Sequence, residues 1–362
     1  DQQTGQIIKP QQRPPTRWAA TGVGHQRLAA LNTMTTSPLD APVPSSWRRT
    51  QRVKNDIIYW SLRLLVATLR RIPYVLASAS APALGWIAGL LMRPDRRRAD
   101  AQLRERLGEA DPRRRRRLVR RMFVHFARSL VELLHVRRFV AGPSRIGIGA
   151  AERATLDAAF AEGRGGALAT GHLGDWERLA QVLANAGYGV NCVAKPLYDP
   201  RLTRWVHAER TRFGMQVLWR GDPHTGQNLK QTFAHNRMLA VLIDQDTKVQ
   251  GAFVPFFGKP AFTPTAAAEL AQRFAAPVVV VWMHRHAGRH VVNVVRVPLH
   301  SDADPGDDPI RELTARLNRQ LEDAIRECPE QWVWLHARWR RQPDAAAPSQ
   351  AREQTTQTPI VP

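Results

Sequence analysis

The chain has 362 residues, of which 43% are hydrophobic, so it can form one large or two ordinary domains with a sizeable core. Lysine and arginine number 53 against 31 aspartate and glutamate, and the formal net charge of +22 favours a polyanionic partner such as nucleic acid or an anionic membrane. The two cysteines, Cys192 and Cys328, stand far apart and outside any CxxC motif, which excludes a disulfide scaffold and a cysteine-rich zinc site.

The two ends of the chain are polar and show no apolar periodicity. Residues 1–47 are rich in proline, glutamine, threonine and serine and contain no hydrophobic region of a signal peptide, so we expect a disordered N-terminal extension. Met34 opens a more ordinary protein start, which leaves the alternative that the preceding residues lie outside the functional protein. Residues 343–362 are again polar and are expected to form a disordered, solvated tail.

Two apolar segments, Ile57–Leu69 and Ile72–Met92, follow between basic clusters. The second has 21 residues without a charge, which at the rise of an α-helix is enough to cross the hydrocarbon core of a bilayer. Its prolines and glycines make it only mildly apolar, and arginines on both sides give no clear orientation. We predict a membrane-anchoring helical segment over residues 48–93, either as one span or as a hairpin in the interface. A buried helix pair of a soluble protein is the alternative.

The stretch Arg93–Arg121 carries 13 arginines against five acidic residues. Apolar residues with helical spacing follow it as far as Leu134. A nucleic-acid-binding stripe and a merely solvated helix face are alternatives, but basic residues beside apolar helices more often meet lipid phosphates.

From about Gly147 onward, short apolar runs alternate with amphipathic ones. Strands are predicted over Gly166–Thr170, Val190–Ala194, Met215–Trp219, Met238–Ile243, Val278–Met283 and Val291–Val297. Helices are predicted over Glu152–Ala161, Trp176–Ala186, Leu202–Phe213, Gln227–His235, Thr265–Phe274 and Pro309–Glu327. This alternation predicts an α/β domain over residues 94–342, with helices on both faces of a sheet.

The strongest local pattern is the run GHLGDWE from Gly171 to Glu177. An apolar strand ends just before this run and a helix begins near Asp175, so His172 lies in the loop between them. Glu177 falls in the first helical turn, where free N–H groups and the helix dipole favour an anion. Its carboxylate can reach back to one imidazole nitrogen and leave the other free to take a proton from a hydroxyl. Asp175 is the rival partner, although its position also suits a helix N-cap.

Further motifs follow this run along the chain. They are Lys195-Pro-Leu-Tyr-Asp-Pro200, Arg210-Thr-Arg212, Ile243-Asp-Gln-Asp246, Phe253-Val-Pro-Phe-Phe-Gly258 and Cys328-Pro-Glu-Gln-Trp-Val-Trp-Leu-His-Ala-Arg338. Together with the HxxxxD/E pattern in GHLGDWE, they resemble the late acyltransferases of lipid A biosynthesis. This is the lauroyl/myristoyl transferase family of the lysophospholipid acyltransferase-like superfamily. The resemblance runs from about residue 56 to residue 342.

The resemblance implies both a fold and a reaction. The fold would be α/β, a glycerolipid-acyltransferase-like mixed sheet flanked by helices, with an N-terminal apolar helical membrane anchor. The reaction would move a fatty acyl chain from acyl-carrier protein to a hydroxyl of a Kdo-bearing lipid A precursor, without a cofactor or metal ion. His172 would be the general base and Glu177 its orienting carboxylate. Since neither cysteine lies in a nucleophile context, we expect direct transfer without an acyl-enzyme.

The resemblance also assigns substrate-binding residues. Arg210 or Arg212 would bind a phosphate or the reaction's oxyanion, because a guanidinium is permanently charged and bidentate. Two solvated arginines are the alternative. The family commonly has arginine at the position of Lys195, and lysine meets phosphate only as a point charge, so headgroup recognition is expected to differ. Asp244, at the end of a strand where ligands of open α/β sheets collect, is assigned to the architecture of the site.

Two aromatic stretches each allow more than one interpretation. The stretch Phe253–Phe262 is expected to line an acyl-chain groove, to touch the bilayer or to form a plain packed turn. Trp332, Trp334 and Trp339, interleaved with basic residues, are expected in the headgroup layer of a membrane or on an RNA-stacking surface.

The expected partners are acyl-carrier protein, the lipid acceptor and anionic phospholipids, at the cytoplasmic face of a Gram-negative inner membrane. The positive net charge complements all three, and nucleic acid is not expected as a partner. One alternative is the same chemistry on another glycolipid, a lysolipid or a pigment ester. Another is a non-catalytic basic protein on this scaffold that binds membrane or nucleic acid, against which the intact His172 and Glu177 argue.

Overall fold

The computed structural model describes residues 37–136, 147–300 and 308–343. The predicted disordered stretches lie largely outside these ranges, but residues 37–47 are described and form turns. Trp47 is buried there and stacks on Tyr198, with the ring centroids 5.5 Å apart. This part of the predicted extension therefore packs onto the domain.

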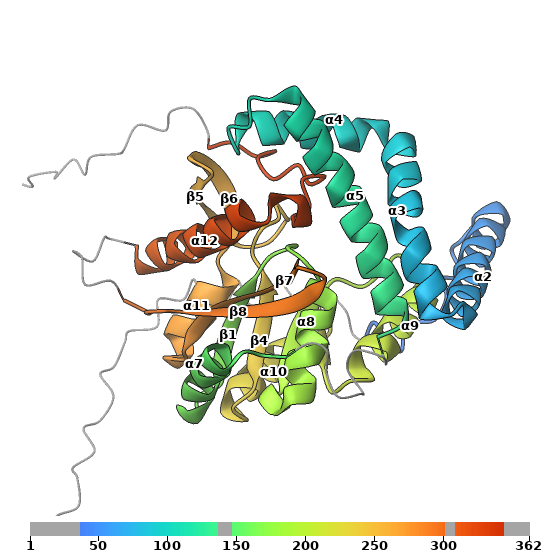
Figure 1. The fold of residues 1–362 in the computed structure, drawn as a ribbon. Coiled ribbons are helices and arrows are strands. Elements are labelled where there is room, and N and C mark those ends of the chain that lie inside the picture. Colours follow the sequence, from blue (N-terminus) through green and yellow to red (C-terminus); the bar gives the residue numbers. More distant parts are fainter. Residues whose placement is uncertain (1–36, 137–146, 301–307, 344–362) are drawn as a thin grey trace, which may run out of the picture.

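The centre of the fold is a six-stranded sheet, part of which is labelled in Figure 1. Its strand order is β3-β2-β4-β1-β7-β8. Its strands are β1 (Gly166–Thr170), β2 (Val190–Ala194), β3 (Gln216–Trp219), β4 (Met238–Leu242), β7 (Val278–His286) and β8 (Arg289–Val297). Neighbouring strands are parallel except for β7 and β8, which are antiparallel. The predicted mixed sheet is confirmed, and each predicted strand is present.

Strand β1 shows how the sheet separates two cores. All five of its residues are buried, because a parallel strand at the centre of a sheet is covered on both faces. Side chains alternate along it, so Ala167 and Ala169 join one hydrophobic cluster and Leu168 joins the other.

Helices cover both faces of the sheet. The first face carries α11 (Ala266–Phe274), α12 (Pro309–Glu327) and an antiparallel hairpin of β5 (Gly251–Phe256) and β6 (Lys259–Pro264). The second face carries α7 (Ala150–Ala161) and α8 (Trp176–Leu183). Among the described residues from β1 onward, the other elements are α9 (Pro200–Thr211), α10 (Thr225–Ala234), a π-helical turn (Ala184–Tyr188) and a 3₁₀ turn (Pro329–Gln331).

Among the described residues, four helices precede α7: α2 (Arg49–Arg71), α3 (Tyr74–Leu91), α4 (Arg93–Glu105) and α5 (Pro112–Leu134). Helices α3 and α5 run side by side (Figure 1). The buried residues of α3 are all small and recur every fourth position: Ala77, Ala81, Gly85 and Gly89. A Cβ at Gly85 would lie 2.6 Å from the Cα of Val124, so only glycine permits this close approach of the two helices.

The opposite faces of α2 and α3 expose large apolar side chains. On α3 these include Val75, Leu76 and Leu91, with exposed fractions of 62–77%. Trp60 and Leu64 of α2 are exposed by 63% and 69%. Among the described residues, α3 is the one helix whose length and composition would allow it to cross a membrane. Exposed apolar faces of this kind indicate a membrane or partner surface; that α2 and α3 anchor the chain in a membrane stays a prediction.

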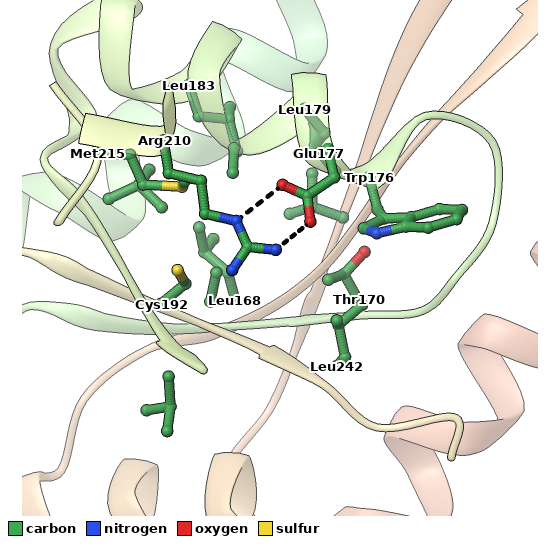
Figure 2. Close-up of a pocket in the computed structure, with 15 residues that line it drawn as sticks. Leu168, Thr170, Trp176, Glu177, Leu179, Leu183, Cys192, Arg210, Met215 and Leu242 are labelled. Carbon is green, nitrogen blue, oxygen red and sulfur yellow. Dashed lines mark hydrogen bonds and ion pairs between the residues drawn. The ribbon is translucent and has the colours of Figure 1, made fainter. Parts of the chain in front are cut away.

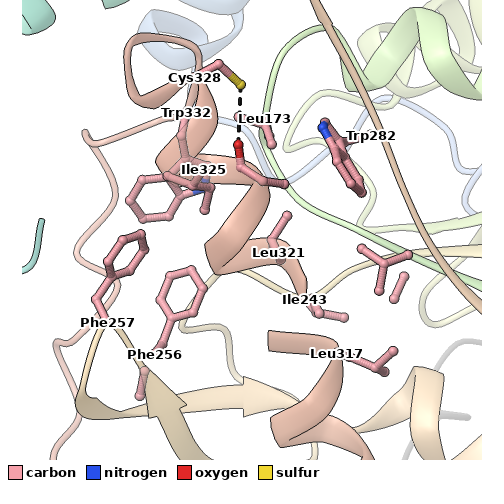
Figure 3. Close-up of a cluster of buried hydrophobic side chains, with 14 of the residues drawn as sticks. Leu173, Ile243, Phe256, Phe257, Trp282, Leu317, Leu321, Ile325, Cys328 and Trp332 are labelled. Carbon is pink, nitrogen blue, oxygen red and sulfur yellow. Dashed lines mark hydrogen bonds between the residues drawn. The ribbon is translucent and has the colours of Figure 1, made fainter. Parts of the chain in front are cut away.

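The aromatic stretches near the C-terminal half form core. Phe256 and Phe257 are at most 5% exposed and pack with Trp332 beside Leu321 of α12 (Figure 3). The interpretation of this stretch as a packed turn is confirmed for these two phenylalanines. The three tryptophans Trp332, Trp334 and Trp339 are exposed by 8% or less. Their predicted placement on a headgroup or RNA-stacking surface is wrong, because the β5–β6 hairpin and α12 cover them.

Candidate active site

His172 lies in the loop between β1 and α8, at the carboxyl edge of the parallel strands. Thr170 of β1 stands opposite Leu242 of β4, so the residues that follow these two strands become neighbours. The Nδ1 atom of His172 lies 2.8 Å from Oδ1 of Asp244, and the backbone N–H of His172 donates to Oδ2 at 2.6 Å. Asp244 therefore holds both the ring and the backbone of His172.

Asp244 is completely buried, and its Oδ2 also accepts a hydrogen bond from Nε1 of Trp332 at 2.8 Å. Burial opposes its ionisation, but the electrostatic interaction and hydrogen bond with His172 and the hydrogen bond from Trp332 hold the pKa of Asp244 well below its usual range. An ionised carboxylate at Nδ1 keeps the ring proton on that nitrogen. The Nε2 atom of His172 is left with a lone pair, as a general base requires.

The Nε2 atom of His172 faces a second polar pair, Gln245 and His336. The amide nitrogen of Gln245 lies 3.3 Å from Nε2 of His172 and 2.7 Å from Nε2 of His336. Burial and the nearby His172 lower the pKa of His336 to about 4, so His336 is neutral at neutral pH and accepts a hydrogen bond from the amide. The ring of Trp176 packs edge-on against His172, with centroids 4.9 Å apart. The imidazole is thus held from several sides.

The carboxylate of Glu177 binds Arg210 and not the imidazole of His172, contrary to the prediction. Its two carboxylate oxygens accept hydrogen bonds from the guanidinium of Arg210, one of them from Nε at 3.0 Å (Figure 2). The predicted Glu177–His172 pairing is wrong because the β1–β4 register brings Asp244 to Nδ1, whereas α8 directs Glu177 toward α9.

The Glu177–Arg210 pair borders an apolar cavity of about 80 Å³ between α8 and strands β1, β2 and β4. Leu168, Leu179 and Leu183 contribute to its wall (Figure 2). Burial disfavours the charge on Arg210, but the charge and hydrogen bonds of Glu177 outweigh burial and raise the pKa of Arg210.

Both cysteines are poor candidates for a nucleophile. Burial raises the pKa of the Cys192 thiol, which lines the cavity, to about 11. Burial likewise raises the pKa of Cys328 to about 12. The reactive species of cysteine is the thiolate, which neither residue forms at neutral pH.

A buried ionic network supports the start of α8. Asp175 caps the helix by accepting from the backbone N–H of Arg178, which confirms its N-cap assignment. The guanidinium of Arg178 contacts carboxylate oxygens of Asp175 and Glu132, each at 2.6 Å. Arg285 binds the other oxygen of Glu132 at 2.6 Å. His290 lies 3.2 Å from Glu132. Glu132, Asp175 and His290 are spaced closely enough to hold a metal ion, but these arginines already neutralise both carboxylates.

Two predicted substrate-binding residues lie on the surface. Lys195 directly follows β2 at the carboxyl edge of the sheet and is exposed. Arg212 is exposed too, and its guanidinium lies 3.7 Å from Glu209, which also binds Arg70 of α2. Arg212 is therefore directed toward α2 and away from the Glu177–Arg210 pair.

Sequence reasoning did not assign Trp332, Gln245 or His336 to the site, although the motifs around Asp244 and Trp332 were recognised as a group. Those motifs contained two signals. Gln245 stands between two aspartates, and His336 lies close in sequence to three tryptophans. The arrangement as a whole can remove a proton from a hydroxyl group at Nε2 of His172, with Asp244 stabilising the imidazolium that forms.

The sequence of the chain has relatives with known names. It is 27% identical over 189 residues to a phosphatidylinositol mannoside acyltransferase of Mycobacterium tuberculosis, a stretch that covers 51% of this chain and 57% of that protein. It is 28% identical over 193 residues to the protein of the same name from Mycolicibacterium smegmatis, covering 51% of this chain and 60% of that protein. The matched stretches thus span less than two thirds of these relatives. The profile of the bacterial lipid A biosynthesis acyltransferases matches residues 48–341, and the chain belongs to this acyltransferase family.

Proposed function

We propose that this chain transfers a fatty acyl group from acyl-carrier protein to a hydroxyl of a Kdo-bearing lipid A precursor at the cytoplasmic face of the inner membrane. The observation that carries the proposal is the hydrogen bond of 2.8 Å between Nδ1 of His172 and the buried Asp244. This arrangement prepares Nε2 as a base at the edge of the sheet where α/β enzymes bind their ligands.

The chemical steps follow from that geometry. Nε2 of His172 takes the proton of the acceptor hydroxyl while the oxygen attacks the thioester carbonyl carbon. The C–S bond then breaks, and the thiolate of the carrier leaves and recovers the proton from the imidazolium. Asp244 stabilises the imidazolium throughout. No covalent acyl-enzyme forms, in agreement with the raised pKa values of the two cysteines, whose thiols remain protonated.

Membrane association is supported by the exposed apolar faces of α2 and α3 and by the arginine-rich helices that follow them. We assign the acceptor phosphates to Lys195 and to the arginines at the end of α9, Arg210 and Arg212. For Arg210 this role requires that a phosphate compete with Glu177, whose two carboxylate oxygens accept hydrogen bonds from Nε and Nη2 of the guanidinium. The apolar cavity beside this pair is a candidate position for part of the acyl chain, although about 80 Å³ is small for a ligand site.

A second acceptor is favoured by the named relatives. The two relatives described above are phosphatidylinositol mannoside acyltransferases, which favours a mannosylated or other glycolipid hydroxyl as the second candidate acceptor of the same base. We rank the lipid A precursor first because the family match extends over residues 48–341, whereas the stretches matched to these relatives cover 51% of the chain.

The test is acyl transfer by the full chain in detergent micelles. Labelled acyl-carrier protein of several chain lengths is mixed with a tetra-acylated, Kdo-bearing lipid A precursor, a phosphatidylinositol mannoside or a lysophospholipid. We expect turnover on the first acceptor, its loss in His172→Ala, and full retention in His224→Ala, which removes an exposed histidine. Turnover on another acceptor alone would replace the substrate assignment. Unchanged turnover in His172→Ala would refute the mechanism.

A further inference from the structure

A groove of about 570 Å³ lies between α3, α4 and α5. The residues of α4 that line it lie on a different helix face from Ala99 and Leu103, which are buried in the core. On the side of α4 turned away from the groove, Gln102 donates to the backbone carbonyl of His336, a residue of the candidate active site, at 2.7 Å. The groove and the active site are thus separated by the body of α4. The volume of the groove is within the range of small-molecule sites, which is about 300–1,000 Å³.

The rim of the groove is strongly basic. Its arginines come from two helices at helical spacing: Arg96, Arg97 and Arg104 from α4, and Arg116 and Arg120 from α5. All five are exposed. Arg104 lies 3.5 Å from Glu105, and the other four have no ion-pair partner among the described residues.

The acidic residue that lines the groove does not offset this charge. Asp100 accepts a hydrogen bond from Nε of Arg115 at 3.1 Å, and Arg115, itself 8% exposed, is held further by two backbone carbonyls. These two residues neutralise one another. Because the remaining guanidiniums around one groove repel each other, an anion bound between them would lower the electrostatic energy.

The floor of the groove is apolar and continues onto the exposed apolar face of α3. Gly85 and Gly89 of α3 are buried against α5, where Phe123 lies at the base of the groove. Trp86 and Leu90 line the groove as well and are exposed by 54% and 42%. The apolar floor therefore opens directly onto the exposed face of α3. A ligand that fits both parts must join an anionic group to a hydrocarbon chain.

We propose that this groove binds one anionic phospholipid of the bilayer, at a site separate from the catalytic centre. The phosphodiester binds to the arginines of the rim, whose planar guanidiniums suit a bidentate contact with phosphate oxygens. An acyl chain lies along Trp86 and Leu90 on the outer face of α3. An inorganic anion would use only the rim, and an acidic protein helix would leave the apolar floor unfilled, so the lipid satisfies both parts of the groove.

The experiment measures lipid retained by the purified full chain, independently of acyl transfer. The protein is extracted in detergent, supplied with dioleoylphosphatidylglycerol or dioleoylphosphatidylcholine, and examined by native mass spectrometry. We expect the wild type to retain one phosphatidylglycerol in preference to phosphatidylcholine. The variant R97Q/R116Q/R120Q should retain at least about tenfold less phosphatidylglycerol.

A matched control distinguishes specific lipid binding in the groove from electrostatic attraction by the net charge of the protein. R113Q/R117Q/R121Q removes three exposed arginines from the same basic region but from outside the groove, so the change in net charge is identical. This control should retain phosphatidylglycerol within about twofold of wild type. Circular dichroism checks that both variants keep their helix content.

The remaining outcomes overturn the proposal. Equal loss in the two triple variants would show attraction by net charge only, and equal retention would show that the groove is not the lipid site. If the groove variant keeps the lipid but loses binding to acyl-carrier protein, the groove is a docking surface for an acidic protein. Because lipid retention needs no turnover, failure here leaves the proposed reaction untouched.

Discussion

Replacing Asp244 with asparagine tests the central element of the candidate site with little change in shape. The carboxylate accepts three hydrogen bonds: from Nδ1 and the backbone N–H of His172, and from Nε1 of Trp332. An asparagine oxygen can replace Oδ2 and keep the last two. Its amide nitrogen then faces Nδ1 of His172 and donates to it. The ring proton moves to Nε2, and the lone pair that a general base needs is lost from that atom.

The expected effect is large on rate and small on stability. Loss of a correctly protonated base and of the charge that stabilises the imidazolium should lower kcat/KM by about 10³- to 10⁴-fold, or about 4–5.5 kcal/mol in the activation barrier. Folding loses a charge-assisted hydrogen bond, but the cost of burying a charge disappears with it. We therefore expect the free energy of unfolding to change by no more than about 2 kcal/mol.

The assay is the micellar acyl transfer described above, with urea unfolding measured on the same samples. The matched control is Asp246→Asn, because the side chain of Asp246 is also buried but binds Arg341, with Nε to Oδ1 at 2.5 Å. Asp246→Asn should keep most of the activity. A value of kcat/KM for Asp244→Asn within about threefold of wild type would refute the assignment, and so would an equal loss in the control.

Three further predictions concern stability. Burial lowers the pKa of His125 to about 4, so between about pH 6.5 and 4 the unfolded chain binds a proton at this residue that the folded chain does not bind. The free energy of unfolding should therefore fall as the pH decreases through this range, and His125→Phe should reduce the slope by up to about 1.4 kcal/mol per pH unit. Urea titrations at several pH values measure the slope, and an unchanged slope in the variant would contradict the prediction. At Gly174, where φ is +61°, a Cβ would clash with the carbonyl oxygen of Met283, so Gly174→Ala should lower the free energy of unfolding by at least about 3 kcal/mol. Gly163 has a similar φ of +69° but open space around it, so Gly163→Ala should lower the free energy of unfolding by about 1 kcal/mol. Equal losses in the two variants would show that the clash at Gly174 is relieved. Gly85→Leu should lower the Tm by several degrees by separating α3 from α5, and a Tm equal to that of wild type would contradict this packing.

The elements that sequence reasoning located best are those whose signal is local. Strand β1 has the predicted bounds, Gly166–Thr170, because a continuous apolar run between polar turns has few other solutions. The β5–β6 hairpin was not predicted, since prolines at positions 255 and 260 disfavour strands. They are tolerated because the hairpin forms a separate two-stranded sheet, and they stand opposite one another in it.

The partner of His172 could not be predicted in the same way. Glu177 is five residues from His172 and Asp244 is 72 residues away, so proximity in sequence favoured the wrong carboxylate. Choosing Asp244 requires knowing that β4 is the parallel neighbour of β1, which depends on the packing of the whole sheet. Glu177 was then left to form its ion pair with Arg210.

Helix α5 connects the exposed helices α2 and α3 to the loop that carries His172. At one end of the connection, Gly85 of α3 lets the two backbones pack closely. Along α5, Nε2 of His125 bonds the carbonyl of Gly174 at 3.0 Å, and Glu132 binds Arg178 of α8. Removing one partner of a buried ion pair typically costs 3–5 kcal/mol, so these contacts resist movement of the loop relative to α5. If α3 is held by a bilayer, α5 therefore fixes the height and orientation of His172 above it, and under the proposed reaction an acceptor hydroxyl in the headgroup layer would meet Nε2 of His172 at a defined depth.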